Sequence, residues 1–239
     1  ESNNMFHPWT SEVKNILHKG ENELLVHFLS PINKVLPFLQ SKDHTLPADN
    51  DQIKKTSPYT RKAPYHYGWD WGPSLATSGV WRSVELIGLG AWSIESTHMI
   101  QEKISKHSAK LVLEMCVDSS IETEAGLTIV DNQSEIKIVN SVPLSKGLNQ
   151  LRQSIVINHP DLWWPAGHGD QNLYDFQIEL RTKECKQRLT KRVGIRDFKV
   201  EQKKDKDGTS FTFIINGKPI FSKGANWIPA DSFTTRLKK

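Results

Sequence analysis

The chain has 239 residues, 37% of them hydrophobic and 24% charged, a balance that is ordinary for one large or two smaller globular domains. The formal net charge is +4, and the densest basic run, residues 203–206, is broken by Asp205. Because the lysines are scattered among acids, we expect no nucleic-acid partner. No apolar run approaches the roughly 20 residues that a membrane helix needs, so we expect no membrane partner either.

Two short elements are predicted before a long loop. Residues 11–17 predict a helix, with Ser11 as a suitable N-cap. Residues 23–29 predict a strand, which Ser30-Pro31 ends because proline cannot donate to a sheet ladder. Residues 37–64 are polar, rich in Pro, Asp and Asn, and without periodicity. Such a long loop in a compact domain is usually functional.

The next motif, residues 68–73, has the sequence GWDWGP. Its glycines and proline predict a turn-bounded loop that presents Asp70 between Trp69 and Trp71. A carboxylate between two flat apolar rings suits a sugar, because sugar C–H groups pack on indole faces and the carboxylate accepts hydrogen bonds from vicinal hydroxyls. In the alternative, these tryptophans and a third one in a strand predicted at residues 80–86 belong to the core, and the aspartate caps a turn.

From about residue 90 onward the pattern indicates a second, all-β unit. Short strands alternate with turn residues at roughly ten-residue spacing, which is typical of an immunoglobulin-like sandwich. Hairpins are predicted at residues 205–208 and 216–217, and residues 224–227 predict the end of a further strand. The predicted strands are residues 111–117, 126–130, 135–139, 153–157, 173–180, 190–193, 198–203, 210–215 and 219–223.

Four segments have distinctive sequences. They are residues 3–33, residues 61–86 (RKAPYHYGWDWGPSLATSGVWRSVEL), residues 162–180 (LWWPAGHGDQNLYDFQIEL) and residues 213–233 (FIINGKPIFSKGANWIPADSF). In this order they resemble segments of β-mannosidases, members of glycoside hydrolase family 2. The resemblance covers nearly the whole chain.

This resemblance implies a mainly β chain built from three parts. A partial jelly-roll (galactose-binding-like) sandwich is followed by an immunoglobulin-like β-sandwich and by the first strand of a (β/α)8 barrel. We expect these parts at residues 1–90, 91–200 and 201–239. Only the middle part has enough predicted strands to be complete, since a jelly roll and the barrel each need about eight. The start at Glu1, without Met, fits an internal piece of a longer polypeptide.

The resemblance also implies a sugar-binding site. In the family the matching tryptophan–aspartate–tryptophan loop reaches into the active site of the barrel. Trp69 is then expected to form an apolar wall of the sugar site, and Asp70 to bind the sugar hydroxyls. Trp71 is expected to be a second wall or an anchor. Trp227 is expected at the C-terminal end of the first barrel strand, the face that carries active sites. In the alternative, Trp227 packs on the barrel rim and Asp231 caps the next helix.

No catalytic residue is predicted within the chain. A retaining glycosidase uses two carboxylates about 5–5.5 Å apart, one as acid and base and one as nucleophile. In the resembled family both are glutamates late in the barrel, beyond Lys239. Glu85 lies in a predicted strand, and Glu122 and Glu124 lie in a polar turn region. These contexts suit neither catalytic role.

The remaining motifs are expected to be structural. Residues 163–164, two adjacent tryptophans, resemble a sugar platform, but in a sandwich such a pair usually buries one ring and braces a loop with the other. Cys116 and Cys185 are expected to be free, mostly buried thiols. The histidines lack ligand spacing, so the sequence predicts no metal and no cofactor. The sequon at residues 132–134 is too common by chance to imply secretion.

Three functions remain open from the sequence. The first is a segment of a retaining exo-β-mannosidase, with a β-mannoside as substrate and the missing catalytic barrel of the same polypeptide as its partner. The second is a non-catalytic carbohydrate-binding module, and the third is a purely structural sandwich. Another family 2 specificity, β-galactosidase or β-glucuronidase, is a lesser alternative, because the WDW and NWIPAD sequences are similar to those of mannosidases.

Overall fold

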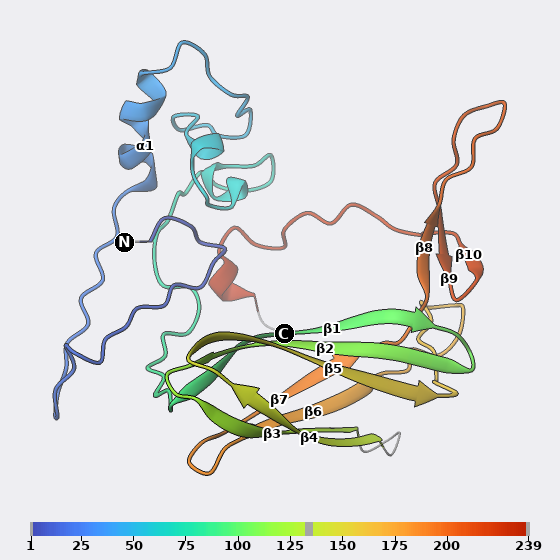
Figure 1. The fold of residues 1–239 in the computed structure, drawn as a ribbon. Coiled ribbons are helices and arrows are strands. Elements are labelled where there is room, and N and C mark those ends of the chain that lie inside the picture. The colour runs from blue at the N-terminus through green and yellow to red at the C-terminus, as the bar shows by residue number, and fades with distance from the viewer. Residues whose placement is uncertain (1, 132–135, 238–239) are drawn as a thin grey trace. The chain divides into compact units, whose positions relative to one another are not determined.

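The computed structural model describes residues 2–131 and 136–237, which divide into two compact units (Figure 1). The first unit contains Glu1–Leu86 and the returning segment Ala225–Lys239, and the second contains Ile87–Gly224. The described residues form ten strands, one α-helix and three short 3₁₀ helices. All ten strands lie in the second unit. The prediction of a mainly β chain is confirmed.

Seven antiparallel strands of the second unit form two facing sheets (Figure 1). One sheet has the order β1-β2-β5 and the other β4-β3-β6-β7. The immunoglobulin-like sandwich is thus confirmed, and every strand predicted for it overlaps an observed one. Glu135 of one predicted strand and the sequon at residues 132–134 lie outside the described residues. The strands are β1 (Trp92–Ile104), β2 (Ser108–Ser119), β3 (Thr123–Asp131), β4 (Ile136–Leu144), β5 (Gly147–Asn158), β6 (Tyr174–Arg181) and β7 (Lys186–Val193).

The core of the sandwich follows from the two-residue period of its strands. In β6, buried Tyr174, Phe176, Ile178 and Leu180 alternate with less buried residues. Full burial of such side chains contributes about 1.5–3 kcal/mol each, so this core holds the two sheets together. The other buried core residues are Trp92, Ala109, Leu111, Leu113, Met115, Val117, Ala125, Leu127, Ile129, Leu144, Ile155, Ile157 and Ile195.

A separate three-stranded sheet of order β10-β9-β8 follows the sandwich. Its turn residues Asn216 and Gly217 have φ values of 50° and 79°, as a two-residue hairpin with left-handed central residues requires. In the other turn, the Asp205 carboxylate accepts hydrogen bonds from the N–H groups of Asp207 and Gly208 at 2.8 and 2.9 Å. Both hairpin predictions are confirmed. The strands are β8 (Phe198–Glu201), β9 (Thr212–Ile215) and β10 (Lys218–Ile220).

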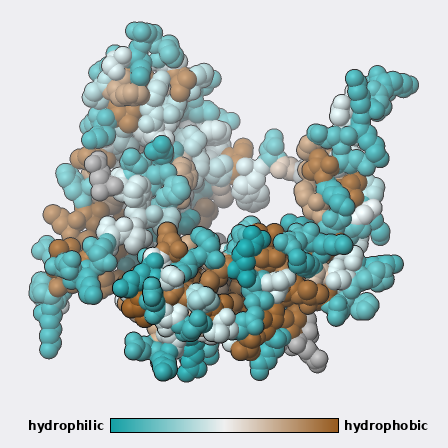
Figure 2. Space-filling view, in the orientation of Figure 1, coloured by the Kyte–Doolittle hydropathy of each residue, from teal (hydrophilic) through white to brown (hydrophobic). Residues whose placement is uncertain are grey.

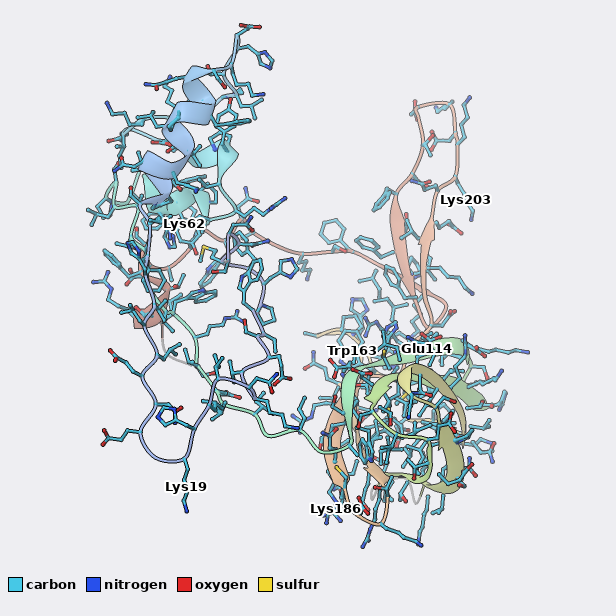
Figure 3. All side chains as sticks on the ribbon, turned by 60° about the vertical axis from the view of Figure 1, so that its left-hand side comes forward. Lys19, Lys62, Glu114, Trp163, Lys186 and Lys203 are labelled. Carbon is cyan, nitrogen blue, oxygen red and sulfur yellow. The ribbon has the colours of Figure 1, made fainter. Side chains whose placement is uncertain are left out.

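Trp163 and Trp164 brace the junction between the sandwich and this hairpin, where Figure 3 labels Trp163. Both side chains are half-buried and neither belongs to the core cluster, so the prediction that the sandwich core includes one of the two rings is wrong. The Trp163 ring packs closely on Gly194, where an added Cβ would lie 2.8 Å from it. Arg196 lies 5.0 Å from the Trp163 ring centroid, and Lys218 lies 5.1 Å from that of Trp164. Both rings therefore already pack on protein groups.

The first unit departs most from its prediction. Residues 11–17 form only a turn, and the strands predicted at residues 23–29 and 80–86 are not formed. A strand needs a neighbour for its backbone hydrogen bonds, and none of the described residues pairs with either segment. Most of their apolar side chains are consequently exposed, to 85% at Leu25 and 73% at Leu86, whereas Trp81 is half-buried. Figure 2 shows hydrophobic side chains at the surface of this unit.

Helix α1 (Pro31–Gln40) stands where the sequence predicts the end of a strand and the start of a loop. The Ser30 hydroxyl accepts a hydrogen bond from the Asn33 N–H at 3.3 Å, and Pro31 takes the first helical position. Ser30-Pro31 is therefore a helix start and not a strand terminator. The loop that follows contains the 3₁₀ helix Ser57–Tyr59 and ends at a second one, Pro64–Tyr67.

The strand predicted at residues 224–227 is not formed either. A strand of a parallel barrel has a neighbour on each side, and no described residue pairs with this segment. The last element of the described residues is a third 3₁₀ helix, Thr234–Arg236.

Candidate functional site

The tryptophan–aspartate–tryptophan motif forms a tight turn that its glycines hold in place. The Gly72 N–H donates to the Trp69 carbonyl at 3.3 Å, and these two residues form an antiparallel bridge. Gly68 leads into the turn with a φ of +126°. A Cβ atom on Gly68 would lie 2.4 Å from the Asn50 carbonyl oxygen and 2.6 Å from the Ser74 hydroxyl oxygen. Only glycine fits at this position.

Asp70 lies on the exposed side of this turn. Trp71 is 37% exposed, whereas Trp69 and Trp81 are half-buried, so none of the three tryptophans is a core residue. Among the described residues, no group donates a hydrogen bond to the Asp70 carboxylate or pairs with its charge. The alternative in which the aspartate caps a turn therefore lacks the contact that it requires. The carboxylate can accept hydrogen bonds from a ligand.

The long loop that precedes the turn, which ends at the 3₁₀ helix Pro64–Tyr67, supports the turn. Tyr67 is completely buried, and its hydroxyl lies 2.8 Å from the Thr60 hydroxyl. Further back, the buried Asp51 carboxylate accepts the N–H groups of Ser57 at 2.9 Å and Ile53 at 3.1 Å. Burial acts to raise the pKa of Asp51, but these and neighbouring backbone hydrogen bonds outweigh it and lower the pKa. The loop is therefore fixed by buried polar contacts.

The chain returns to the turn near its C-terminal end. A Cβ atom on Gly72 would lie 2.8 Å from the hydroxyl oxygen of Ser232, which is 6% exposed. The Ser232 backbone also hydrogen-bonds with buried His66. Sequence reasoning missed both Ser232 and His66, because no local pattern reports a contact between residues so far apart in the chain.

Two other candidates lie in this returning segment. The Asp231 carboxylate accepts the Phe233 N–H at 2.7 Å and two hydrogen bonds from Arg236 at 2.7 and 2.8 Å. The bonds from Arg236 and Phe233 lower the pKa of Asp231. The interpretation of Asp231 as the cap of a helix is wrong, because the 3₁₀ helix that follows has Phe233 at its N-cap position and no side-chain cap hydrogen bond. Its carboxylate is engaged by Arg236 and the Phe233 N–H instead. Trp227 is 86% exposed, and its contact with a sugar stays a prediction.

Other candidate chemistry is sparse in residues 2–131 and 136–237. Glu85 and Glu124 are exposed and accept hydrogen bonds from serine hydroxyls at 2.8 and 2.6 Å. Cys116 and Cys185 are free, as predicted, and half-buried. This part of the chain contains no group of three side chains that could hold a metal ion. Nor does it contain a helix of the length and hydrophobicity needed to traverse a bilayer.

His66 makes the first unit sensitive to acid. Its side chain is 4% exposed. Burial is the largest effect on the pKa of His66, and the positive charge of Lys62 is the second. Together they lower this pKa from 6.5 to about 4, although the hydrogen bond with the Ser232 backbone acts to raise it. Between about pH 4 and pH 6.5 the unfolded chain binds more protons than the folded chain. The free energy of unfolding therefore falls as the pH falls from 6.5 towards 4. The loss is at most about 3 kcal/mol, because one pKa unit corresponds to about 1.4 kcal/mol.

His66→Gln should lack this part of the pH dependence, since glutamine does not titrate. Calorimetric unfolding of both proteins in chloride buffers, between about pH 7.5 and 4.5, measures the difference. Equal pH dependence in the two proteins would show that His66 is not its source.

Comparison with known proteins identifies relatives of both units. Residues 1–82 match the glycosyl hydrolase 2 galactose-binding domain-like family, and residues 92–196 match glycosyl hydrolases family 2. The chain is 34% identical to β-mannosidase B of Aspergillus niger, over 99% of this chain and 28% of that protein. It is also 34% identical to the β-D-mannosidase of Dictyoglomus thermophilum, with a TM-score of 0.86 over 95% of this chain and 28% of that one. The exo-chitosanase of Amycolatopsis orientalis is 25% identical, with a TM-score of 0.51 over 61% of this chain and 17% of that one.

The chain thus spans 28% of the length of the two β-mannosidases that it matches. The first family match contains the Trp69–Gly72 turn, and the second contains the seven strands of the sandwich. The match extends over nearly the whole chain, as the four distinctive segments predicted. The chain belongs to glycosyl hydrolase family 2 and is similar over nearly its whole length to β-mannosidases of that family.

Proposed function

We propose that the chain is the substrate-binding and scaffold part of a retaining exo-β-mannosidase, which releases terminal β-D-mannose from oligosaccharides. Relatives that carry the name β-mannosidase match almost all of this chain, which supports the proposal. In it, residues 1–90 are the C-terminal part of a galactose-binding-like domain, and residues 91–200 are the immunoglobulin-like sandwich. Residues 201–239 are a hairpin and the entry into the catalytic barrel.

The observation that carries the proposal is the free, exposed carboxylate of Asp70 on a fixed turn, in which Trp69 and Trp71 are its neighbours in the sequence. Two vicinal sugar hydroxyls donate to one carboxylate, and the charge strengthens both bonds. Trp69 supplies an apolar wall for the C–H face of the sugar, and Trp71 is a second wall or an anchor. Trp227 adds a further exposed ring from the entry into the barrel.

Bond cleavage in this proposal belongs to the barrel. A retaining enzyme protonates the leaving oxygen with one carboxyl group and attacks the sugar with the other, and the same pair then directs water at the glycosyl-enzyme. In the proposed enzyme these two groups are glutamates outside the present chain. The chain binds and orients the sugar but transfers no proton, and its partner is the barrel of the same polypeptide.

A carbohydrate-binding module is the second candidate, because the whole Trp69–Gly72 turn is built from residues of this chain. Calorimetric titration of the 239-residue chain with mannosides separates the two. Measurable binding without the barrel favours the module, and no heat of binding excludes it. A purely structural sandwich is less well supported, since none of the tryptophans around Asp70 is buried. A comparison of p-nitrophenyl β-mannoside with the corresponding galactoside and glucuronide tests the specificity of the longer polypeptide.

The chain alone should not hydrolyse p-nitrophenyl β-mannoside. Without a carboxyl pair in a barrel, neither protonation of the leaving group nor formation of the glycosyl-enzyme can proceed. The measurement is p-nitrophenol release by the purified chain, with the longer polypeptide as the positive control. Turnover that co-purifies with the chain through several columns would refute the proposal that bond cleavage belongs to the barrel.

A further inference from the structure

One face of the three-stranded sheet β10-β9-β8 is apolar. In the register of this sheet Val200 and Ile220 both lie opposite Phe213, and directly opposed residues share a face. The centroid of the Phe213 ring lies 5.7 Å from that of Phe198 and 5.5 Å from that of Phe211. These five residues are called the aromatic face below: Phe198, Val200, Phe211, Phe213 and Ile220.

The other side of the sheet is more polar. Lys199 and Glu201 alternate with the apolar residues of β8. They form ion pairs with Asp197 at 3.0 Å and with Lys203 at 2.9 Å. An antiparallel sheet with one apolar and one polar side packs its apolar side against another layer of protein.

The described residues leave the aromatic face largely uncovered. Phe198 is 50% exposed, Val200 42% and Phe211 64%. The sandwich core, as far as the described residues form it, includes none of the five side chains. Figure 2 shows hydrophobic residues at the surface of this sheet. Exposed apolar patches of this kind mark surfaces that bind other protein.

The sheet that carries this face is fixed to the sandwich. The Asn216 side chain accepts a hydrogen bond from the Asp197 N–H at 2.9 Å and donates one to the Trp163 carbonyl at 3.0 Å. The Asn216 N–H donates to the Asp197 carbonyl at 2.8 Å, and Lys218 of β10 lies over the Trp164 ring. A surface held in one orientation loses little entropy when a partner packs on it.

The size of the aromatic face decides between two occupants. With roughly 200 Å² for a whole phenylalanine side chain, the exposed part of the face is roughly 400 Å². Two copies of the chain that met through it would bury about 800 Å², whereas a stable interface between separate proteins buries about 1,200 Å² or more. A partner in the same polypeptide needs less area, because the covalent link holds it at an effective concentration of about 1 mM or more.

We propose that the aromatic face is the surface on which the catalytic barrel of the longer polypeptide packs. The inference rests on the proposed function, in which residues 201–239 lead into that barrel. The chain spans 28% of the length of the β-mannosidases that it matches, so a longer polypeptide of this kind has ample protein to cover the face. The contacting surface of the barrel is apolar, and the sandwich and the sheet support the barrel as one body.

Thiol labelling tests whether the face is covered. Val200→Cys is compared with Val139→Cys and Val156→Cys, which replace exposed valines on the outside of the two sandwich sheets. Reaction of each new thiol with a small maleimide is followed by mass spectrometry of its peptide. In the longer polypeptide Val200→Cys should react about tenfold more slowly than both controls, because its thiol reacts only when the contact opens. Equal rates would overturn the proposal.

The same labelling of the 239-residue chain separates the barrel from a second copy. Here the three thiols should react at similar rates. Slow reaction of Val200→Cys in a chain that sediments as a dimer would assign the face to a second copy and overturn the proposal.

Photo-crosslinking identifies the part of the longer polypeptide that covers the face. With p-benzoylphenylalanine in place of Phe211, the crosslinked peptides should come from beyond residue 239 of the same molecule. Peptides that precede residue 1, or that come from another copy, would overturn the assignment to the barrel.

Hydrolysis of p-nitrophenyl β-mannoside by the same samples keeps this proposal apart from the proposed function. An active enzyme in which Val200→Cys reacts as fast as the controls would overturn the packing of the face and leave the proposed function intact. A protected face on a polypeptide without this activity would contradict the proposed function and support the packing.

Discussion

Replacing Asp70 with alanine in the proposed parent enzyme should lower kcat/KM on a β-mannoside by about ten- to a hundredfold or more. In the proposed complex the carboxylate accepts hydrogen bonds from sugar hydroxyls away from bulk water, and a charge-assisted bond of this kind contributes about 1.5–3 kcal/mol. The part of that energy realised only in the distorted transition state raises kcat. Stability should be little changed, because no described residue bonds to the Asp70 carboxylate.

Two milder substitutions serve as controls for this prediction. Asp70→Asn should lose less activity, since the amide keeps one acceptor oxygen. Trp71→Phe should have a small effect if the ring only anchors the turn. Measuring kcat/KM and the melting temperature on each purified variant distinguishes binding from folding. An Asp70→Ala enzyme with a lower melting temperature but wild-type kcat/KM would show that the carboxylate is structural.

Gly68→Ala should lower the free energy of unfolding of the first unit by about 3 kcal/mol or more. The added Cβ would lie 2.4 Å from the Asn50 carbonyl oxygen, which belongs to the backbone and cannot move aside cheaply. The φ of +126° is also one that alanine rarely adopts. Denaturant unfolding measures the loss, and hydrogen exchange over residues 63–74 should show that the turn opens.

Gly79→Ala is the matched control for this substitution. Nothing lies within 4 Å of a Cβ atom at Gly79, so the change should alter stability by less than about 0.5 kcal/mol. If Gly68→Ala and Gly79→Ala unfolded at the same denaturant concentration, the close approach of Gly68 to Asn50 would not exist in solution.

The sandwich could be predicted from the sequence because its information is local. In β6 the apolar residues recur at every second position, which is enough to identify a half-buried strand. Strand β1 was missed because it is the edge strand of its sheet, and its buried and exposed residues do not alternate. The prediction that the core includes one ring of residues 163–164 failed because the glycines and cations around the two rings cannot be placed from local sequence.

The first unit could not be predicted in the same way. Residues 23–29 and 80–86 have strand-like composition, but a strand forms only where another pairs with it, and pairing is not a local property. Ser30-Pro31 is compatible with the end of a strand and with the start of a helix, and the neighbouring residues decided in favour of α1. The GWDWGP turn was predictable because glycine and proline restrict the backbone directly. The support of that turn by His66 and Ser232 could not be predicted, because these two residues lie far apart in the chain.

A crystal structure of the longer polypeptide with a mannose-configured inhibitor shows whether Asp70 binds the sugar. The Asp70 carboxylate oxygens should lie about 2.5–3.0 Å from two adjacent sugar hydroxyls. The Trp69 ring should pack on the C–H face of the same sugar. An inhibitor bound in the barrel with no hydrogen bond to Asp70 would show that this carboxylate is not a sugar ligand.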